Sequence, residues 1–259
     1  MQNIMALRGM ALTVAFIIYT ALAPVTAQTG PVVKNIVIVH GAFADGSGWE
    51  EVFNLLQAHG FNVTVVQNPL TSLEDDVAAA ERVLDKQDGP VVLVGHSWGG
   101  AVITQAGVHP RVASLVYVAA FVPDTGESVL DLIKSTPPAP ENGILPPDAK
   151  GFVWYDKAKY HAGFASDLSI AKTNFMYASQ APIAAKCFVT PLTQAAWKTR
   201  PSYAIVATED KSINPSVERN MYKRASATVT ELKGSHVIFM SNAKAVVDVI
   251  RAAAGRSAH

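Results

Sequence analysis

Short apolar runs alternate with longer amphipathic segments along most of the chain. Runs rich in valine and isoleucine are typical of strands buried on both faces; they lie at residues 35–40, 62–67, 91–96, 114–120, 202–208 and 228–234. Helices are predicted between and after them, at residues 47–60, 72–89, 98–109, 215–225 and 242–254. Strands that alternate with helices form parallel sheets covered on both faces. The pattern therefore predicts an α/β fold with a mostly parallel central sheet.

Two of these helices carry start signals. The first has Ser47 as its N-cap and Glu50 three residues later, which is the spacing of a capping box. The second repeats this arrangement with Ser72 and Asp75. Glycines at positions 60 and 89 are predicted to end them.

The alternation of strands and helices stops between residues 122 and 200. Residues 135–148 contain five prolines and are predicted to form a loop, with short helices on either side. The simplest organisation is one core, residues 28–121 and 201–259, interrupted by a helical cap insert at 122–200. Apolar side chains of this insert could line a pocket or form the insert's own core; they are Phe152, Trp154, Tyr155, Phe164, Phe175, Met176, Tyr177 and Trp197.

The N-terminus has the layout of a secretory signal peptide. Arg8 precedes an apolar run at 10–22, followed by Pro24 and a small-residue cleavage pattern that ends at Ala27. The alternative is a membrane anchor, but polar residues interrupt the run, which is shorter than the ~20 apolar residues of a span. We therefore expect residues 1–27 to be removed from an exported protein, periplasmic or secreted, with no stable membrane anchor after cleavage.

Composition narrows the classes of partner. The chain has 259 residues with 21 Lys plus Arg and 21 Asp plus Glu, without a long block of either sign. No basic stripe indicates nucleic acid, and a neutral small-molecule substrate fits this balance best. The single cysteine, Cys187, excludes an internal disulfide. It lacks a turn signature around it, so we expect a small buried hydrophobe rather than a nucleophile.

The segment "VVLVGHSWGG" at 91–100 places a serine between a buried strand and a helix. Gly95 and Gly99 flank Ser97 in a Gly-x-Ser-x-Gly nucleophile elbow, which raises the hydroxyl above the sheet at a helix N-terminus. There the backbone N–H of Trp98 can stabilise a developing oxyanion. The neighbouring His96 is expected to have a packing role. We therefore predict that Ser97 is a nucleophile.

A serine nucleophile requires a base and a carboxylate that orients the base. His236 follows the last predicted strand, at the sheet edge where catalytic groups gather. Asp210 follows the strand before it and completes the chain order Ser97, Asp210, His236. Glu209 is the rival acid, because one of two adjacent carboxylates must turn away. Asp124, after the strand at 114–120, is a weaker alternative whose other role is a turn cap.

The loop after the first strand completes the predicted site. His40 ends that strand and is expected to shape the loop, and Gly41 lets the backbone approach the serine. Ala42 is predicted to supply the second N–H of the oxyanion hole, with Phe43 as the adjacent possibility. No histidine cluster has the spacing of metal ligands and no phosphate-binding loop is present, so neither a metal nor a cofactor is expected.

Five motifs together resemble the α/β-hydrolase family, and within it the small plant-type methyl-ester esterases and hydroxynitrile lyases. They are "HGAFADGSGW", "GHSWGG", "YVAAFVPDTGES", "ATEDKSINP" and "LKGSHVIFM", spread over residues 34–254. The resemblance implies an α/β-hydrolase fold with a helical cap and a serine hydrolase mechanism. In it Ser97 attacks, His236 relays the proton and Asp210 orients His236.

Two departures from the lyases favour ester cleavage. The lyases of this branch carry a threonine and a lysine where this chain has Gly41 and Val237. The expected function is hydrolysis of a small, neutral and partly apolar carboxylic ester through an acyl-enzyme. Alternatives are other reactions of the same triad (lactonase, thioesterase, amidase, perhydrolase or hydroxynitrile lyase) and a non-catalytic ligand-binding protein.

Overall fold

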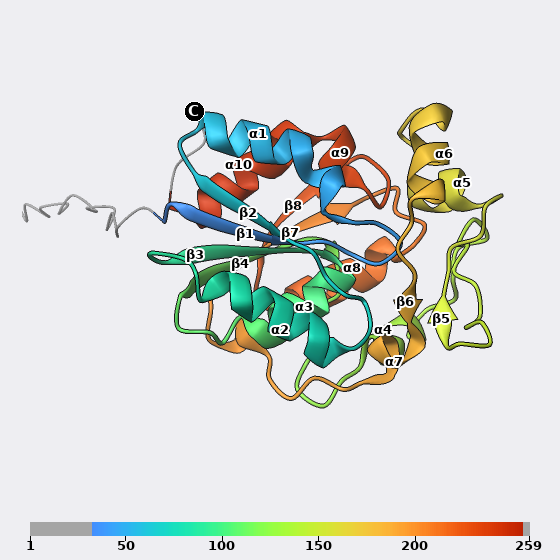
Figure 1. Ribbon diagram of the computed structural model, residues 1–259, viewed down its shortest axis with the longest axis horizontal. Helices are drawn as coiled ribbons and strands as arrows, with labels where there is room; N and C mark the ends of the chain where they lie inside the picture. Colours follow the sequence, from blue (N-terminus) through green and yellow to red (C-terminus); the bar gives the residue numbers. More distant parts are fainter. Residues whose placement is uncertain (1–32, 256–259) are drawn as a thin grey trace, which may run out of the picture.

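A six-stranded parallel sheet runs through the molecule (Figure 1). The computed structural model describes residues 33–255, so the predicted signal peptide at 1–27 lies outside the described residues. In spatial order the strands are β2 (Asn62–Val66), β1 (Asn35–Val39), β3 (Val91–Ser97), β4 (Val112–Ala120), β7 (Ser202–Ala207) and β8 (Thr228–Leu232). Every neighbouring pair is parallel. The six strands predicted from the apolar runs are confirmed.

Helices cover both faces of this sheet (Figure 1). On one face lie α1 (Glu50–Ala58), α10 (Ala243–Ala253) and the short α9 (Ile238–Ser241). On the other lie α2 (Leu73–Leu84), α3 (Trp98–Ala106) and α8 (Pro215–Arg224). The predicted α/β fold class is confirmed.

The start of the first helix differs from the prediction. Ser47 is not an N-cap; instead Asp45 accepts a hydrogen bond from the Ser47 N–H at 2.8 Å. This bond caps a 3₁₀ turn at Gly46–Trp49, and α1 begins only at Glu50. The short Asp45 side chain reaches the N–H two residues on, so the tighter turn forms before the α-helix.

The second helix begins as predicted and ends early. Ser72 accepts a hydrogen bond from the Asp75 N–H at 3.0 Å, which confirms the predicted N-cap. The helix ends at Leu84 rather than near Gly89. Beyond Leu84 the N–H groups of Lys86 and Gln87 bond three residues back, so the chain tightens into a turn before the glycine.

Most of the cap segment, residues 122–200, lies beyond the carboxyl ends of the strands, and its last residues run back along α3 to the start of β7 (Figure 1). Its helices are α4 (Val129–Ile133), α5 (Tyr160–Phe164), α6 (Ile170–Ala178) and α7 (Ala185–Val189), with a 3₁₀ turn at Ala196–Lys198. It also holds an antiparallel ribbon of β5 (Phe152–Val153) and β6 (Ile183–Ala184), which the sequence did not predict. Two residues per strand are too few to show an alternating pattern.

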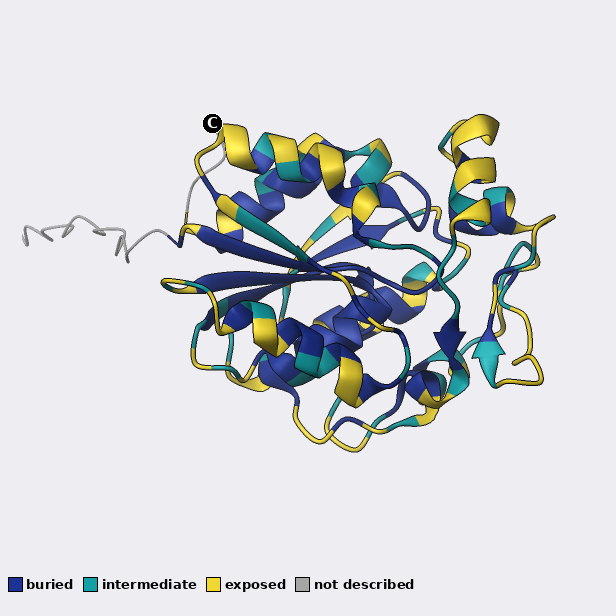
Figure 2. Cartoon of the chain, in the orientation of Figure 1, coloured by how far each residue is buried: buried dark blue, intermediate teal, exposed yellow. Residues whose placement is uncertain are grey.

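Burial is greatest at the centre of the sheet and falls toward its edges (Figure 2). Every residue of β1 and of β3 is buried, whereas every residue of β8 is exposed or half-buried. The loops that follow the central strands are therefore anchored in the best-packed part of the molecule.

Candidate active site

Three side chains from separate loops form a hydrogen-bonded chain at the carboxyl edge of the sheet. Ser97 ends β3, Asp210 follows β7, and His236 follows β8. The Oγ atom of Ser97 lies 2.8 Å from His236 Nε2, and His236 Nδ1 lies 2.6 Å from Asp210 Oδ2. All three residues are buried. The arrangement can move a proton from the serine hydroxyl to an imidazole that a carboxylate orients.

The backbone at Ser97 adopts the conformation of an elbow. Its φ of 52° and ψ of −120° lie in a region that side-chain-bearing residues rarely adopt. Glycines make this turn possible: a Cβ on Gly99 would lie 2.4 Å from the Val39 carbonyl oxygen, and one on Gly100 2.2 Å from that of Phe121. The strained turn thus places the hydroxyl at the N-terminus of α3.

The two adjacent carboxylates after β7 point in different directions. Asp210 Oδ1 accepts hydrogen bonds from the N–H groups of Ser212 (2.7 Å) and Ile213 (2.9 Å), which leaves Oδ2 for the imidazole. Glu209 is turned outward, with its carboxylate 3.6 Å from Lys233 Nζ. The structure therefore brings Asp210, and not Glu209, to His236.

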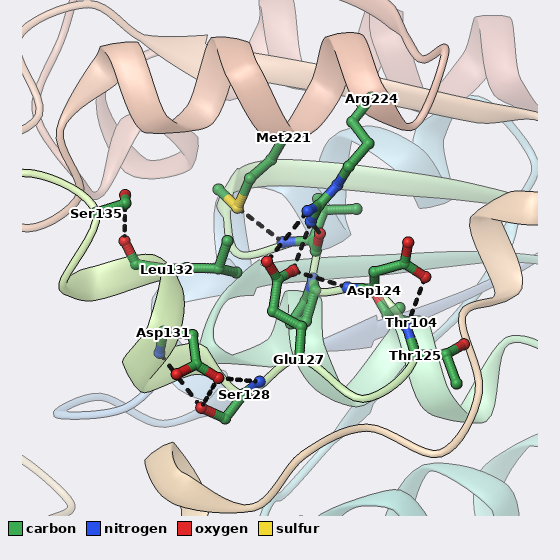
Figure 3. A network of polar contacts seen from close by, with 12 residues as sticks. Thr104, Asp124, Thr125, Glu127, Ser128, Asp131, Leu132, Ser135, Met221 and Arg224 are labelled. Carbon is green, nitrogen blue, oxygen red and sulfur yellow. Dashed lines mark hydrogen bonds and ion pairs between the residues drawn. The ribbon is translucent and has the colours of Figure 1, made fainter.

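Asp124 lies in a separate polar network (Figure 3). Its carboxylate accepts a hydrogen bond from the Thr125 N–H at 2.6 Å and forms an ion pair with Lys198. Its own N–H donates to Glu127 at 2.9 Å, and Glu127 is also paired with Arg224. Asp124 therefore acts as a turn cap.

Hydrogen bonding in the loop after β1 distinguishes between Ala42 and Phe43, the two candidates for the second oxyanion donor. The N–H of Phe43 donates to the Ala181 carbonyl at 3.0 Å, so it is not available to a substrate. The N–H groups of Ala42 and Trp98 have no acceptor among residues 33–255. Both residues line the small cavity at Ser97. The possibility that Phe43 is the donor is thus disfavoured by its existing bond.

A neutral histidine supports this loop. His40 Nδ1 lies 2.8 Å from the Gly41 carbonyl oxygen, and His40 Nε2 accepts a hydrogen bond from the Asn68 N–H at 2.9 Å. These partners require the tautomer that carries its proton on Nδ1. Burial lowers the pKa of His40, which favours this neutral form. His40 shapes the loop, as predicted.

His96 supports the loop that carries His236. Its Nε2 lies 2.9 Å from the His236 carbonyl oxygen and therefore donates a proton to it. The two rings are 4.7 Å apart. Burial, with a contribution from the neighbouring His236, lowers the pKa of His96 well below its usual value. His96 is a neutral donor in a packed position, in keeping with the packing role expected from sequence.

A carboxylate of the cap segment holds the residue before His236. Asp167, between α5 and α6, accepts hydrogen bonds from the N–H of Ser235 (2.9 Å) and from its hydroxyl. It also accepts one from the Ser241 hydroxyl at 2.7 Å. Sequence reasoning missed Asp167 because its partners lie far along the chain and no local pattern marks it.

A second carboxylate missed from sequence lies beneath the elbow. Asp76 on α2 is fully buried and accepts hydrogen bonds from the Trp98 indole and from the Leu70 N–H, both at 2.7 Å. Burial raises the pKa of Asp76 to about 6. Asp76 therefore fixes the indole of the residue that follows Ser97.

A small cavity at the serine adjoins a larger one. The smaller, about 20 Å³, contains Ser97 and His236 in its wall, and the larger has about 450 Å³. The two share mainly apolar lining residues, which are Phe121, Ile133, Ile144, Phe188, Ser212 and Ile213. Of the insert side chains singled out from sequence, Phe164 alone lines either cavity, and its ring lies 5.1 Å from that of His236.

Among residues 33–255 no group of three or more His, Cys, Asp or Glu side chains is placed to hold a metal ion. No helix in this range is long and apolar enough to span a membrane. Cys187 is buried, as expected, and burial raises the pKa of its thiol to about 12.

Sequence comparison identifies the family. The profile of the alpha/beta hydrolase family matches residues 36–249. The chain belongs to the alpha/beta hydrolase family. This alpha/beta hydrolase is also similar to plant methylesterases: it is 26% identical over 249 residues to putative methylesterase 11, chloroplastic, of Arabidopsis thaliana, covering 82% of this chain and 62% of that protein. The resemblance seen in the five motifs is confirmed.

Two further proteins resemble this alpha/beta hydrolase. A carbendazim hydrolyzing esterase from Nocardioides sp. (strain SG-4G) is 32% identical over 119 residues, or 40% of this chain and 49% of that protein. The match thus spans about half the length of that relative. The crystal structure of a pyrethroid hydrolase from Sphingobium faniae JZ-2 aligns with a TM-score of 0.73 at 22% identity, covering 85% of this chain and 97% of that one. At this identity the likeness concerns the fold.

Proposed function

We propose that this alpha/beta hydrolase cleaves carboxylic esters through a covalent acyl-enzyme. The observation that carries the proposal is the chain of short contacts from Ser97 Oγ to His236 Nε2 (2.8 Å) and from His236 Nδ1 to Asp210 (2.6 Å). A serine hydroxyl becomes a nucleophile when a base is positioned in this way. The names of its relatives, an esterase and a methylesterase, support the same chemistry.

In the first half of the reaction Ser97 Oγ attacks the ester carbonyl carbon. The hydroxyl proton moves to His236 Nε2, and Asp210 stabilises the imidazolium that forms. The carbonyl oxygen becomes an oxyanion that accepts hydrogen bonds from the N–H groups of Ala42 and Trp98. The bond to the alcohol oxygen then breaks, and His236 returns its proton to the departing alcohol.

In the second half water releases the acid. His236 Nε2 takes a proton from a water molecule as the water oxygen attacks the acyl carbon of the acyl-enzyme. The same two N–H groups hold the second oxyanion. When this intermediate collapses, the bond to Ser97 breaks and the proton on His236 returns to the serine oxygen.

The surroundings of the serine favour a neutral, partly apolar ester. The larger cavity is lined mostly by apolar side chains. Groups that the resembling lyases use are absent: a Cβ at Gly41 would lie only 2.7 Å from the Ser97 Cβ, and Val237 is fully buried. Neither position offers a hydroxyl or an amine to a cyanohydrin, which supports ester cleavage over lyase activity.

We also propose that the protein is exported after cleavage at Ala27, on the basis of the charged, apolar and small-residue sequence at 1–27. N-terminal sequencing of the protein recovered outside the cytoplasm tests this. A mature chain that starts at Gln28 is expected. A chain that retains residues 1–27 in the membrane fraction would favour the anchor.

Intact mass after fluorophosphonate treatment tests the catalytic proposal. We expect one adduct on the wild type, none on Ser97→Ala, and one on the matched control Ser216→Ala, whose serine lies on α8 away from the triad. Kinetics on a panel of esters, lactones, thioesters and amides then identifies the preferred substrate class. A folded protein without an adduct would favour the non-catalytic ligand-binding alternative.

A further inference from the structure

A second buried carboxyl group lies against the triad. Glu218 on α8 is 0% exposed, and its Oε2 accepts a hydrogen bond from the N–H of Ala207 at 3.2 Å. Ala207 ends β7, and its carbonyl accepts the N–H of Asp210 at 3.1 Å. The same residue therefore anchors Glu218 and the loop that carries Asp210. Within residues 33–255, Glu218 Oε1 has no N–H or O–H partner, although it is fully buried.

Besides burial, the charge of Asp210 and a side-chain hydrogen bond with it both act to raise the pKa of Glu218, so the two carboxyl groups are neighbours. Two ionised carboxylates in one buried site repel strongly, so one of the pair retains a proton. Asp210 accepts hydrogen bonds from the N–H groups of Ser212 and Ile213 and from His236, whereas Glu218 accepts one backbone N–H. Because hydrogen bonds stabilise the charged form, the negative charge resides on Asp210 and the proton on Glu218.

The electrostatic surroundings agree with this assignment. Burial, together with the adjacent Asp210, raises the pKa of Glu218 well above its usual value. Arg219 on the same helix opposes the shift, but its guanidinium is directed to Glu231 at 2.7 Å. The other titratable groups that face the pair are Tyr222 on α8, Tyr155 of the cap segment and His236. Burial raises the pKa of both tyrosines, so neither adds a negative charge.

We propose that Glu218 is a positioning residue whose neutral carboxyl group donates a hydrogen bond through Oε1 to Asp210 and holds that carboxylate in line with His236. This accounts for the buried Oε1 atom without a donor, because a protonated oxygen is itself the donor. The inference rests on the proposed function for its catalytic consequence, since Glu218 acts only through Asp210. Its protonation can be tested without any substrate.

The stability of Glu218→Gln as a function of pH tests the protonation. Wild-type Glu218 keeps its proton in the folded state and loses it on unfolding above its ordinary pKa. Raising the pH through that range therefore destabilises the wild type, whereas the amide does not titrate. The Tm of Glu218→Gln relative to wild type is expected to rise as the pH is raised above 4.5, the ordinary pKa of the carboxyl group. A difference that does not change with pH would overturn the proposal.

Steady-state kinetics of two variants test the positioning role. Glutamine can accept the Ala207 N–H through its carbonyl and donate to Asp210 through its amide, so Glu218→Gln is expected to keep kcat within about threefold of wild type. Glu218→Met fills a similar volume without a donor. It is expected to lower kcat by about 10- to 100-fold, as for one lost charge-assisted hydrogen bond, with KM changed by less than about twofold.

A buried neighbour on the same helix controls for lost stability. Met221→Ala opens a cavity one turn from Glu218 and is expected to lower Tm while kcat stays near wild type. Equal losses of kcat in Glu218→Gln and Glu218→Met, or wild-type kcat in both, would overturn the inference while the proposed function stands. A wild type that forms no fluorophosphonate adduct would instead refute the proposed function, and the pH dependence of Tm would still report on the proton of Glu218.

Discussion

The sheet core and the cap segment stabilise the same site in different ways. In the core, the strands that present Ser97 and Asp210 are buried and paired along their length with parallel neighbours. In the cap segment no helix exceeds nine residues, and Ile170 and Phe175 of the longest one are exposed. The core thus positions backbone through strand pairing and packing, whereas the cap packs a buried cluster of Tyr155, Tyr160 and Phe164 and adds individual polar contacts.

Those contacts reach the two loops that matter most for the proposed chemistry. The hydroxyl of Tyr160 donates to the Phe43 carbonyl at 3.0 Å, next to Ala42. Asp167 binds the residue that precedes His236. The comparison indicates that charge-assisted or buried polar contacts from the cap can hold loops that the core presents. Substitutions in each region should therefore differ in what they damage.

The largest effect is expected in the core, from the two carboxylates after β7. Asp210→Asn should lower kcat by about 10⁴-fold, because an amide cannot hold the imidazole in the required tautomer or stabilise its positive charge. Glu209→Gln is the matched control and should retain wild-type kcat, since Glu209 faces Lys233. Steady-state ester hydrolysis measures both. Equal activity of the two variants would contradict the assignment of Asp210.

The buried Asp76 should make stability depend on pH. Its pKa is raised from an ordinary 3.8 to about 6, so the folded state binds a proton more tightly than the unfolded state. The stabilisation is complete below the ordinary value and is lost as the pH rises through about 6. Relative to Asp76→Asn, the unfolding free energy of wild type should fall by about 3 kcal/mol across this range and stay constant above it.

Urea unfolding of both proteins at a series of pH values between about 3.5 and 7.5 measures this difference. The variant serves as the reference because other carboxyl groups titrate equally in the two proteins. If the stability of wild type relative to Asp76→Asn instead grew with pH, the hydrogen bonds from Trp98 and Leu70 would lower the pKa of Asp76 more than burial raises it.

A smaller effect is expected for the contact from the cap to the histidine loop. Asp167→Asn replaces a charged acceptor by an amide and weakens the hold on Ser235. It should cost about 1.5–3 kcal/mol of stability and lower kcat by about 10-fold through displacement of His236. Asp156→Asn is the control in the same segment, because Asp156 accepts a hydrogen bond from the exposed N–H of Lys159. Thermal unfolding and kcat together show whether the cap acts on the site; an unchanged kcat would show that it does not.

The smallest effect is expected on the outer surface of the cap. Phe175 is 65% exposed, so Phe175→Ser should change the unfolding free energy by less than about 0.5 kcal/mol and leave kcat unchanged. Denaturant unfolding and ester kinetics check this. A loss of activity would indicate that α6 closes over the cavity during turnover.

The order of strands and helices could be predicted because it depends on local periodicity. Apolar runs and capping residues mark the core elements within a few residues of their observed ends. The β5–β6 ribbon and α5 could not be predicted, because such short elements depend on contacts with distant segments rather than on their own pattern. The sequence also predicted Ser47 as a cap where Asp45 supplies it, because either side chain can cap a turn and the local pattern does not distinguish them.

In the candidate site, too, some features follow from local sequence and others depend on tertiary contacts. The sequence alone determined which loops meet, because parallel strands bring their carboxyl ends to one edge, and it singled out Ser97 through the glycines of its turn. Only the tertiary structure decided that Asp210 rather than Glu209 faces His236, that the Phe43 N–H is already bonded, and which buried carboxyl groups surround the triad. These outcomes depend on side-chain packing between residues far apart in the chain, and no local pattern encodes them.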